Sequence, residues 1–209
     1  MRDNASEVQK EYMHFITSAT KNMRHLIRDL RAFSKVDSTK LNIRPINCEF
    51  MLEEILKELQ SSIEYKKAII EVPENLTEVN GDRIKLKQLF SNLITNALKY
   101  IGKDVIPNIK ITFEDNKDKW IFRIKDNGIG IESKHQQKIF QLFHRLHANN
   151  EYQGTGIGLS LCKKVVNQHF GEIGVESEVN VGSTFYFDIP KDIEAVSYTH
   201  LTLPTICSV

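Results

Sequence analysis

The sequence predicts an α+β fold, a two-layer sandwich in which helices cover one face of a mixed, largely antiparallel sheet, preceded by a long coiled-coil helix. Two observations lead to this prediction. Near the start, apolar residues recur at alternating steps of four and three, which is the seam of a coiled coil. Further on, strands with alternating apolar residues come in pairs joined by polar turns, and amphipathic helices separate the pairs.

The composition is that of an ordinary globular protein. The 209 residues are 41% hydrophobic and 26% charged, and the net charge of +1 gives no electrostatic case for nucleic acid or a membrane surface. No apolar run approaches the about 20 residues that cross a bilayer. Cys48, Cys162 and Cys207 lie far apart without metal-ligand spacing. We therefore expect reduced thiols, a cytoplasmic location, and no contact of this chain with nucleic acid or membrane.

The first helix is predicted at residues 7–35. Its seam residues are Tyr12, Ile16, Ala19, Met23, Leu26, Leu30 and Phe33. No other segment offers a matching helix of similar length, so we expect it to pair with a second chain or with a segment missing from this one. The alternative is a helix lying along its own domain. We divide the chain into a helical segment at 1–36, a linker at 37–47 with at most a short edge strand, a domain at 48–190 and a tail at 191–209.

The domain begins with a predicted helix. Asn47 is expected to cap it, and its apolar positions continue to Ile63. Residues 68–72 predict a short strand, and Asn80-Gly81 is typical of a turn.

A β-hairpin is predicted on either side of the polar turn at residues 115–119. Residues 108–114 alternate, as do Trp120, Phe122 and Ile124. The same alternation places Asp126 on their face, so a carboxylate is aimed toward the buried side. The remaining predicted elements are a short helix at 133–143, a loop at 144–153, a helix from 158 to about 169, and strands at 172–177 and 183–189.

The helix from Asp82, which is expected to cap it, to Tyr100 is the centre of the predicted site. Asn92 and Asn96 stand four residues apart beside its apolar stripe, with Lys99 one turn further on. An amide oxygen held in this way can take one position of a hydrated Mg²⁺ ion and leave the others to phosphates and water. Taken alone, such a pair is more often solvated surface or bonded to a neighbouring loop.

Two glycine patterns follow. Asp126-Asn-Gly128-Ile-Gly130 lies at a strand end, where the carboxylate could accept a hydrogen bond from an amino group and the glycines let the backbone approach a flat ring. Gly154-Thr-Gly156-Ile-Gly158 directly precedes a helix, whose exposed N–H groups would suit a polyphosphate. A plain turn and a flexible hinge are the alternative interpretations of the two patterns taken singly.

The patterns occur in one order as NLITNALKY, DNGIG, FQLFHRLH, GTGIGLSLCKKVV and GSTFYF. Over about residues 7–190 this set resembles the ATP-binding domain of bacterial sensor histidine kinases, within the class shared by gyrase, MutL and Hsp90. The resemblance implies the Bergerat-type ATP-binding fold, with ATP and Mg²⁺ as cofactors. It also implies transfer of the γ-phosphoryl group to a histidine, relay to the receiver domain of a response regulator, and a homodimer formed through the first helix.

The resemblance further implies which residues act. The implied catalytic residues are Asn96, Lys99 and Arg145, and the implied metal ligands are Asn96 and Asn92. The implied nucleotide-binding residues are Asn92, Asn96, Lys99, Tyr100, Asp126, Gly128, Gly130, Ile131, Phe143, Gly154, Thr155, Gly156, Ile157, Gly158, Leu159 and Thr184. Among them, Tyr100 would pack on the adenine, Asp126 would bond its amino group, Thr184 would line its pocket, and Arg145 would reach the γ-phosphate.

The chain departs from the family in its histidines. The family's phosphoacceptor histidine is usually followed by Asp or Glu, and none of the seven histidines here is. Residues 7–35 therefore resemble the second helix of the dimerisation hairpin, and we expect no autophosphorylation by this chain alone. An inert nucleotide-binding and dimerisation module stays open as an alternative, and so, less strongly, does a gyrase- or Hsp90-type ATPase. From about residue 196 the tail resembles a translated sequencing adapter and is excluded from the predicted fold.

Overall fold

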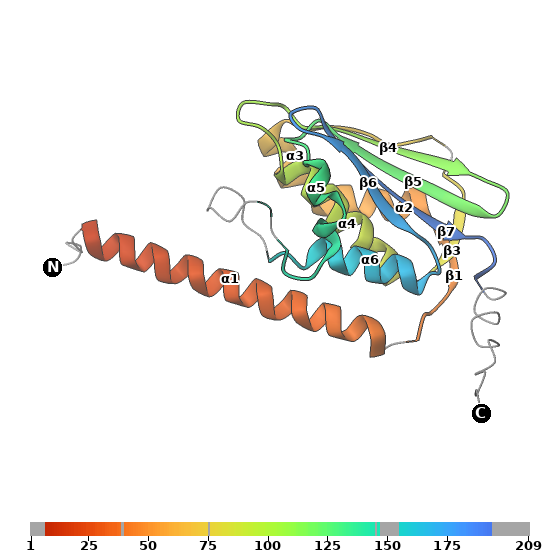
Figure 1. The fold of residues 1–209 in the computed structure, drawn as a ribbon, viewed down its shortest axis with the longest axis horizontal. Helices are drawn as coiled ribbons and strands as arrows, with labels where there is room; N and C mark the ends of the chain where they lie inside the picture. The colour runs from red at the N-terminus through yellow and green to blue at the C-terminus, as the bar shows by residue number, and fades with distance from the viewer. Residues whose placement is uncertain (1–6, 39, 75, 145, 147–154, 194–209) are drawn as a thin grey trace.

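The computed structural model describes residues 7–38, 40–74, 76–144, 146 and 155–193. Arg145, Gly154 and the adapter-like tail lie outside this set, as does most of the predicted loop at 144–153. The elements, labelled in Figure 1, are α1 (Glu7–Ser38), β1 (Arg44–Asn47), α2 (Cys48–Glu58), α3 (Gln60–Lys66), β2 (Ile69–Glu71), β3 (Glu78–Gly81), α4 (Arg83–Lys99), β4 (Asn108–Asp115), β5 (Lys119–Asp126), α5 (Ser133–Gln136), the 3₁₀ turn η1 (Lys138–Phe140), α6 (Gly158–Gln168), β6 (Ile173–Glu178) and β7 (Gly182–Pro190).

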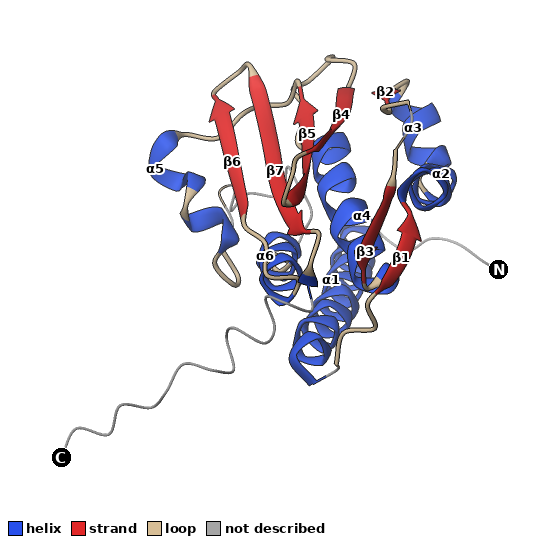
Figure 2. Cartoon of the chain, turned by 90° about the vertical axis from the view of Figure 1, so that its right-hand side faces the viewer, coloured by secondary structure: helices blue, strands red, loops and turns tan. Residues whose placement is uncertain are grey.

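The main sheet has five strands in the order β2-β4-β5-β7-β6. Only β2 and β4 run parallel, and the other neighbouring pairs are antiparallel. Helices α4 and α6 lie against one face of this sheet (Figure 2). At the centre of the interface, the Phe90 ring of α4 meets the rings of Phe122 and Phe187 edge-on, at centroid distances of 5.1 and 5.2 Å. The predicted fold class is therefore confirmed.

Both predicted helix caps are present. The side chain of Asn47 accepts a hydrogen bond from the Phe50 N–H at 2.8 Å. Asp82 Oδ1 accepts from the N–H groups of Ile84 and Lys85 at 3.1 and 3.2 Å, and its side chain is buried. Each cap satisfies N–H groups that the first turn of a helix leaves without a partner. The start of α4 is thus fixed by its own sequence.

Three predictions about chain segments are wrong. The helix expected at 133–143 is instead the four-residue helix α5 followed by the 3₁₀ turn η1. Asn80-Gly81 is not a turn but the end of β3, which pairs antiparallel with β1 so that Asn80 lies opposite Pro45. Val79 of this strand is fully buried, and that burial outweighs the local turn preference. The helix expected to continue to Ile63 is instead two helices, α2 and α3. They meet at Leu59, which has ψ 0° and is both the C-cap of α2 and the N-cap of α3.

The long helix α1 confirms the prediction of a helix over 7–35. Its C-terminal part lies on α6, where Lys164 Nζ donates to the Phe33 carbonyl at 2.9 Å and stands 3.9 Å from the centre of the Phe33 ring. The alternative of a helix lying along its own domain therefore holds for this end. Earlier seam residues are uncovered, with Tyr12 65% and Ile16 59% exposed. None of the helices in the described ranges combines the length and apolarity needed to cross a membrane.

Cys48 and Cys162 are free thiols in the core. Burial raises the pKa of each to about 12. Because the thiolate is the reactive form, both groups behave as small apolar side chains at neutral pH. This environment agrees with the expectation of reduced cysteines.

Candidate functional site

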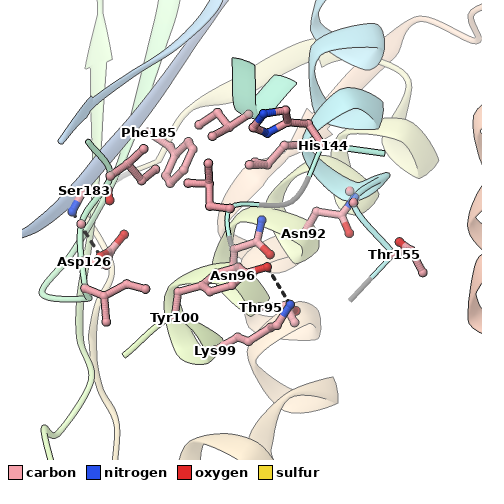
Figure 3. A pocket seen from close by; sticks show the side chains of 18 of the residues that line it. Asn92, Thr95, Asn96, Lys99, Tyr100, Asp126, His144, Thr155, Ser183 and Phe185 are labelled. Atoms are coloured by element: carbon pink, nitrogen blue, oxygen red, sulfur yellow. Dashed lines mark hydrogen bonds between the residues drawn. The ribbon is translucent and has the colours of Figure 1, made fainter. Parts of the chain in front are cut away.

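A cavity of about 270 Å³ lies between α4, the ends of β5 and β7, the start of α6 and the side of α1 (Figure 3). Its lining residues are Asp29, Asn92, Thr95, Asn96, Lys99, Tyr100, Asp126, Ile129, Gly130, Ile131, Ile139, His144, Leu146, Thr155, Gly156, Gly158, Leu159, Ser183 and Phe185.

Helix α4 supplies one wall. Asn92 and Asn96 are half-buried on adjacent turns and turn their side chains to the cavity, with Lys99 one turn further on. Lys99 Nζ donates to Tyr100 Oη at 2.8 Å and lies 4.2 Å from the centre of that ring. Among the residues that the structure describes, no group of three or more His, Cys, Asp or Glu side chains could hold a metal ion. Asn92 and Asn96 bring two amide oxygens to this wall, which are donors of the kind that Mg²⁺ accepts together with oxygens from a ligand and water.

Asp126 ends β5 at the opposite wall. Its side chain is only 7% exposed, and Oδ1 accepts hydrogen bonds from the N–H groups of Gly128 at 2.8 Å and Ser183 at 3.2 Å. Burial raises the pKa of this carboxyl group, although the two hydrogen bonds act in the opposite direction. Both backbone donors hold the same oxygen, so the carboxylate is fixed in place and its second oxygen remains for a ligand in the cavity (Figure 3).

The glycines after Asp126 permit close backbone contacts. A Cβ on Gly128 would stand 2.2 Å from the Tyr100 carbonyl oxygen, which accepts the Ile129 N–H at 3.0 Å. Gly130 has φ +70°, and a Cβ there would lie 2.0 Å from the carbonyl oxygen of Glu178. These glycines therefore let the loop bind the end of α4 on one side and the β6–β7 turn on the other. Gly130 lines the cavity, whereas Gly128 packs behind it.

The second glycine loop brings the start of α6 to the cavity. Gly156 has φ +74°, and Gly156, Gly158 and Leu159 line the space. Ile157 is fully buried and points into the core, so it lies beneath the cavity. As the N-cap of α6 it contributes no side-chain hydrogen bond. The first N–H groups of α6 therefore have no side-chain cap, which is the arrangement that binds anions.

Besides Ile157, two predicted side chains do not line the cavity. Thr184 pairs with Lys125, so it turns to the sheet face opposite Asp126 and does not line the cavity. Its neighbours Ser183 and Phe185, which share the face of Asp126, take that position, and the assignment of Thr184 to the adenine pocket is corrected accordingly. Phe143 is 55% exposed and is not a lining residue, although its N–H donates to the Gly156 carbonyl at 3.1 Å.

Several lining residues had no place in the sequence prediction. They are Asp29, Thr95, Ile129, Ile139, His144, Leu146, Ser183 and Phe185. Ser183 and Phe185 could have been found by continuing the alternation of the last strand back to its start. Asp29 had no local signal, because only the packing of α1 on the domain brings it to the cavity.

Comparisons with known proteins agree on one family. Residues 81–193 match the model of the histidine kinase-, DNA gyrase B-, and HSP90-like ATPases. The chain is 40% identical over 184 residues to the phytochrome-like protein Cph1 of Synechocystis sp., an alignment that covers 88% of this chain and 24% of that protein. It therefore spans about a quarter of the length of this curated relative.

Solved structures share the fold. Full-length ShkA in complex with AMPPNP has a TM-score of 0.72 at 21% identity, over 90% of this chain and 40% of that one. The histidine kinase ThkA in complex with the response regulator TrrA has a TM-score of 0.71 at 26% identity, over 92% and 54%. The family match covers the cavity residues of α4, β5, α6 and β7. The chain therefore belongs to the histidine kinase-, DNA gyrase B-, and HSP90-like ATPase family, as the ATP-binding part of a sensor histidine kinase.

Proposed function

We propose that this chain binds ATP with Mg²⁺ and presents the γ-phosphate for transfer to a histidine of a dimerisation hairpin, from which a response regulator takes it. One observation carries the proposal. A single cavity joins a fixed carboxylate at Asp126, an amide pair at Asn92 and Asn96, and the uncapped start of α6. A purine, a divalent cation and a polyphosphate need those three kinds of group.

At the adenine end, the second oxygen of Asp126 accepts a hydrogen bond from the exocyclic amino group. Gly130, Ile131 and Phe185 provide the walls against which a flat ring packs. Tyr100 lies at the mouth with its hydroxyl group bonded to Lys99. This end supplies base selectivity, because a buried acceptor rejects a base that lacks the matching donor.

At the phosphate end, the N–H groups of Gly158 and Leu159 face the phosphate oxygens, and Lys99 adds a positive charge. Asn92 and Asn96 would hold Mg²⁺, which supplies neutralisation of the phosphate charge. Phosphoryl transfer leaves little covalent work to the protein, so these side chains act by positioning and electrostatics. By the family resemblance, Gly154 extends the phosphate loop and Arg145 reaches the γ-phosphate.

The same proposal assigns the partners. The uncovered apolar seam of α1 suits pairing with a second copy, consistent with a helical segment at 1–36 before a catalytic domain at 48–190. The solved complex of ThkA with TrrA supports a receiver domain as the downstream partner. A cytoplasmic setting fits the buried, unpaired thiols of Cys48 and Cys162.

Replacing Asp126 by asparagine tests nucleotide recognition. The amide keeps the shape of the side chain and one oxygen for the Gly128 and Ser183 N–H groups, but it turns an NH₂ group toward the adenine amino group. Loss of a hydrogen bond to a charged group costs about 1.5–3 kcal/mol, so we expect ATP affinity to fall by about 10- to 100-fold in isothermal titration. Asp118→Asn, an exposed aspartate in the β4–β5 turn, is the matched control and should bind as the parent chain does. Unchanged affinity of Asp126→Asn would refute the adenine assignment.

Transfer in trans separates a kinase from an inert binding module. We expect label from the γ-phosphate of ATP to appear on an added hairpin fragment that contains an acceptor histidine, and not on this chain alone. Asn96→Asp should reduce that transfer strongly, because a carboxylate changes the charge next to the cation and phosphates. Nucleotide binding without transfer by the unmodified chain would favour the inert module, and label on the isolated chain would contradict the absence of an acceptor.

A further inference from the structure

Helix α1 reaches the phosphate end of the cavity. Asp29 is a lining residue, and the Thr155 hydroxyl group of the glycine loop donates to its Oδ2 at 2.6 Å. One turn further along α1, Lys164 of α6 bonds the Phe33 carbonyl. Figure 1 shows α1 passing beneath α6, and Figure 3 shows Thr155 at the edge of the cavity. A residue 126 positions away from Thr155 thus takes part in the proposed phosphate loop.

The negative charge of the Asp29 carboxylate disfavours a polyphosphate at this end of the cavity. Of the other polar groups at this end, Lys99 and the start of α6 suit an anion, and the Asn92 and Asn96 amides are neutral. Asp29 adds a carboxylate to the same space, and like charges at short range repel strongly where water is partly excluded. The Thr155 hydroxyl group has a single proton, so it cannot bond Asp29 and a phosphate oxygen at the same time.

The docking of α1 rests on few contacts. Besides the Asp29–Thr155 and Phe33–Lys164 pairs, Phe33 packs partly buried against the core, whereas Leu26 and Leu30 are 37% and 48% exposed. Little apolar surface therefore holds the helix in place, and the interface is weak enough for a ligand to displace.

We propose that Asp29 sets the phosphate selectivity of this site and makes triphosphate binding and α1 docking antagonistic. This inference rests on the proposed function and deepens it. A nucleoside without phosphates leaves the Asp29–Thr155 bond intact, whereas each added phosphate competes with Asp29 for Thr155 and is repelled by its charge. By linkage, docked α1 lowers ATP affinity by the same factor by which ATP weakens docking.

The first test compares adenosine, ADP and ATP, each with Mg²⁺, on the parent chain and on Asp29→Asn by isothermal titration. The amide oxygen still accepts from Thr155, so the variant removes the charge and keeps the hydrogen bond. We expect unchanged adenosine affinity, a small gain for ADP, and a gain of about fivefold or more for ATP, the lower end of typical coupling. Glu176→Gln removes the same charge from the exposed sheet face away from the cavity and is the matched control.

The second test follows hydrogen exchange of the α1 amides at residues 26–34. ATP should accelerate exchange there in the parent chain, and adenosine should not. Slower exchange with ATP, or an Asp29→Asn variant whose ATP affinity is equal to or below that of the parent, would overturn the role of Asp29. If the parent binds neither adenosine nor ATP, the nucleotide site itself is refuted; if it binds both and the Asp29 expectations fail, only the antagonism is refuted.

Discussion

Replacing Gly130 by alanine should lower the free energy of unfolding by about 3 kcal/mol or more. Gly130 combines φ +70° with a position where a Cβ would lie 2.0 Å from the Glu178 carbonyl oxygen. The clash is with backbone and no rotamer change relieves it, so the β6–β7 turn must move away from the loop after Asp126. Urea denaturation followed by the fluorescence of Trp120, the only tryptophan, measures the change.

Gly102→Ala is the matched control for this prediction. A Cβ at Gly102 would meet only the Val105 side chain, at 3.3 Å, and φ there is not in the left-handed region. Its effect should stay within about 0.5 kcal/mol. Equal losses in the two variants would show that the loop after Asp126 tolerates a side chain, contrary to the structure.

Acidification should destabilise the domain through His169. This ring is fully buried. Its Nε2 accepts the Asp82 N–H at 3.0 Å, so Nε2 carries no proton. Its Nδ1 lies 2.8 Å from the Val165 carbonyl oxygen, which is only an acceptor, so Nδ1 carries the proton. The ring is thus neutral in one tautomer, and burial lowers its pKa. Because the unfolded chain then binds a proton more readily, this contribution to stability is complete above about pH 6.5 and is lost as the pH falls toward the folded pKa.

His169→Leu should show both parts of this role. It leaves the Asp82 N–H without its acceptor at the start of α4, so we expect a loss of about 2–3 kcal/mol at pH 7.5. The variant should also lose part of the pH dependence of the unfolding free energy between pH 7.5 and 5.5. His135→Leu, at a half-buried histidine whose Nδ1 has no partner among the described residues, is the control for replacing a histidine by leucine. An unchanged slope in His169→Leu would contradict the assignment.

The sequence predicted the parts of this fold that are encoded locally. The caps at Asn47 and Asp82 and the alternation that buries Asp126 follow from residues within a few positions of each other. Strand β3 escaped prediction because its partner β1 lies more than thirty residues earlier and its last two residues favour a turn. Local preference is a weak guide wherever distant pairing supplies the burial.

The candidate site likewise has residues that local sequence placed correctly and residues that depend on distant contacts. Helical spacing was enough to place Asn92, Asn96 and Lys99 together, since one element carries all three. Thr184 was misplaced because a shift of one residue along a strand reverses the face, and only the pairing of Ser183 with Asp126 fixes the register. Asp29 reached the cavity through the docking of a separate helix, which no local pattern reports.

The length of helix α4 also sets the distance between the two ends of the cavity. Asn92 and Asn96 lie along the helix, and the carbonyl group of its C-cap, Tyr100, accepts the N–H of Ile129 in the loop that follows Asp126. The distance between the base end and the cation end of the cavity therefore depends on the number of residues in this helix. Each residue adds about 1.5 Å of rise and 100° of rotation. Inserting one residue between Asn96 and Tyr100 would turn the amide pair out of line with the base pocket, so this stretch admits substitution far more readily than a change of length.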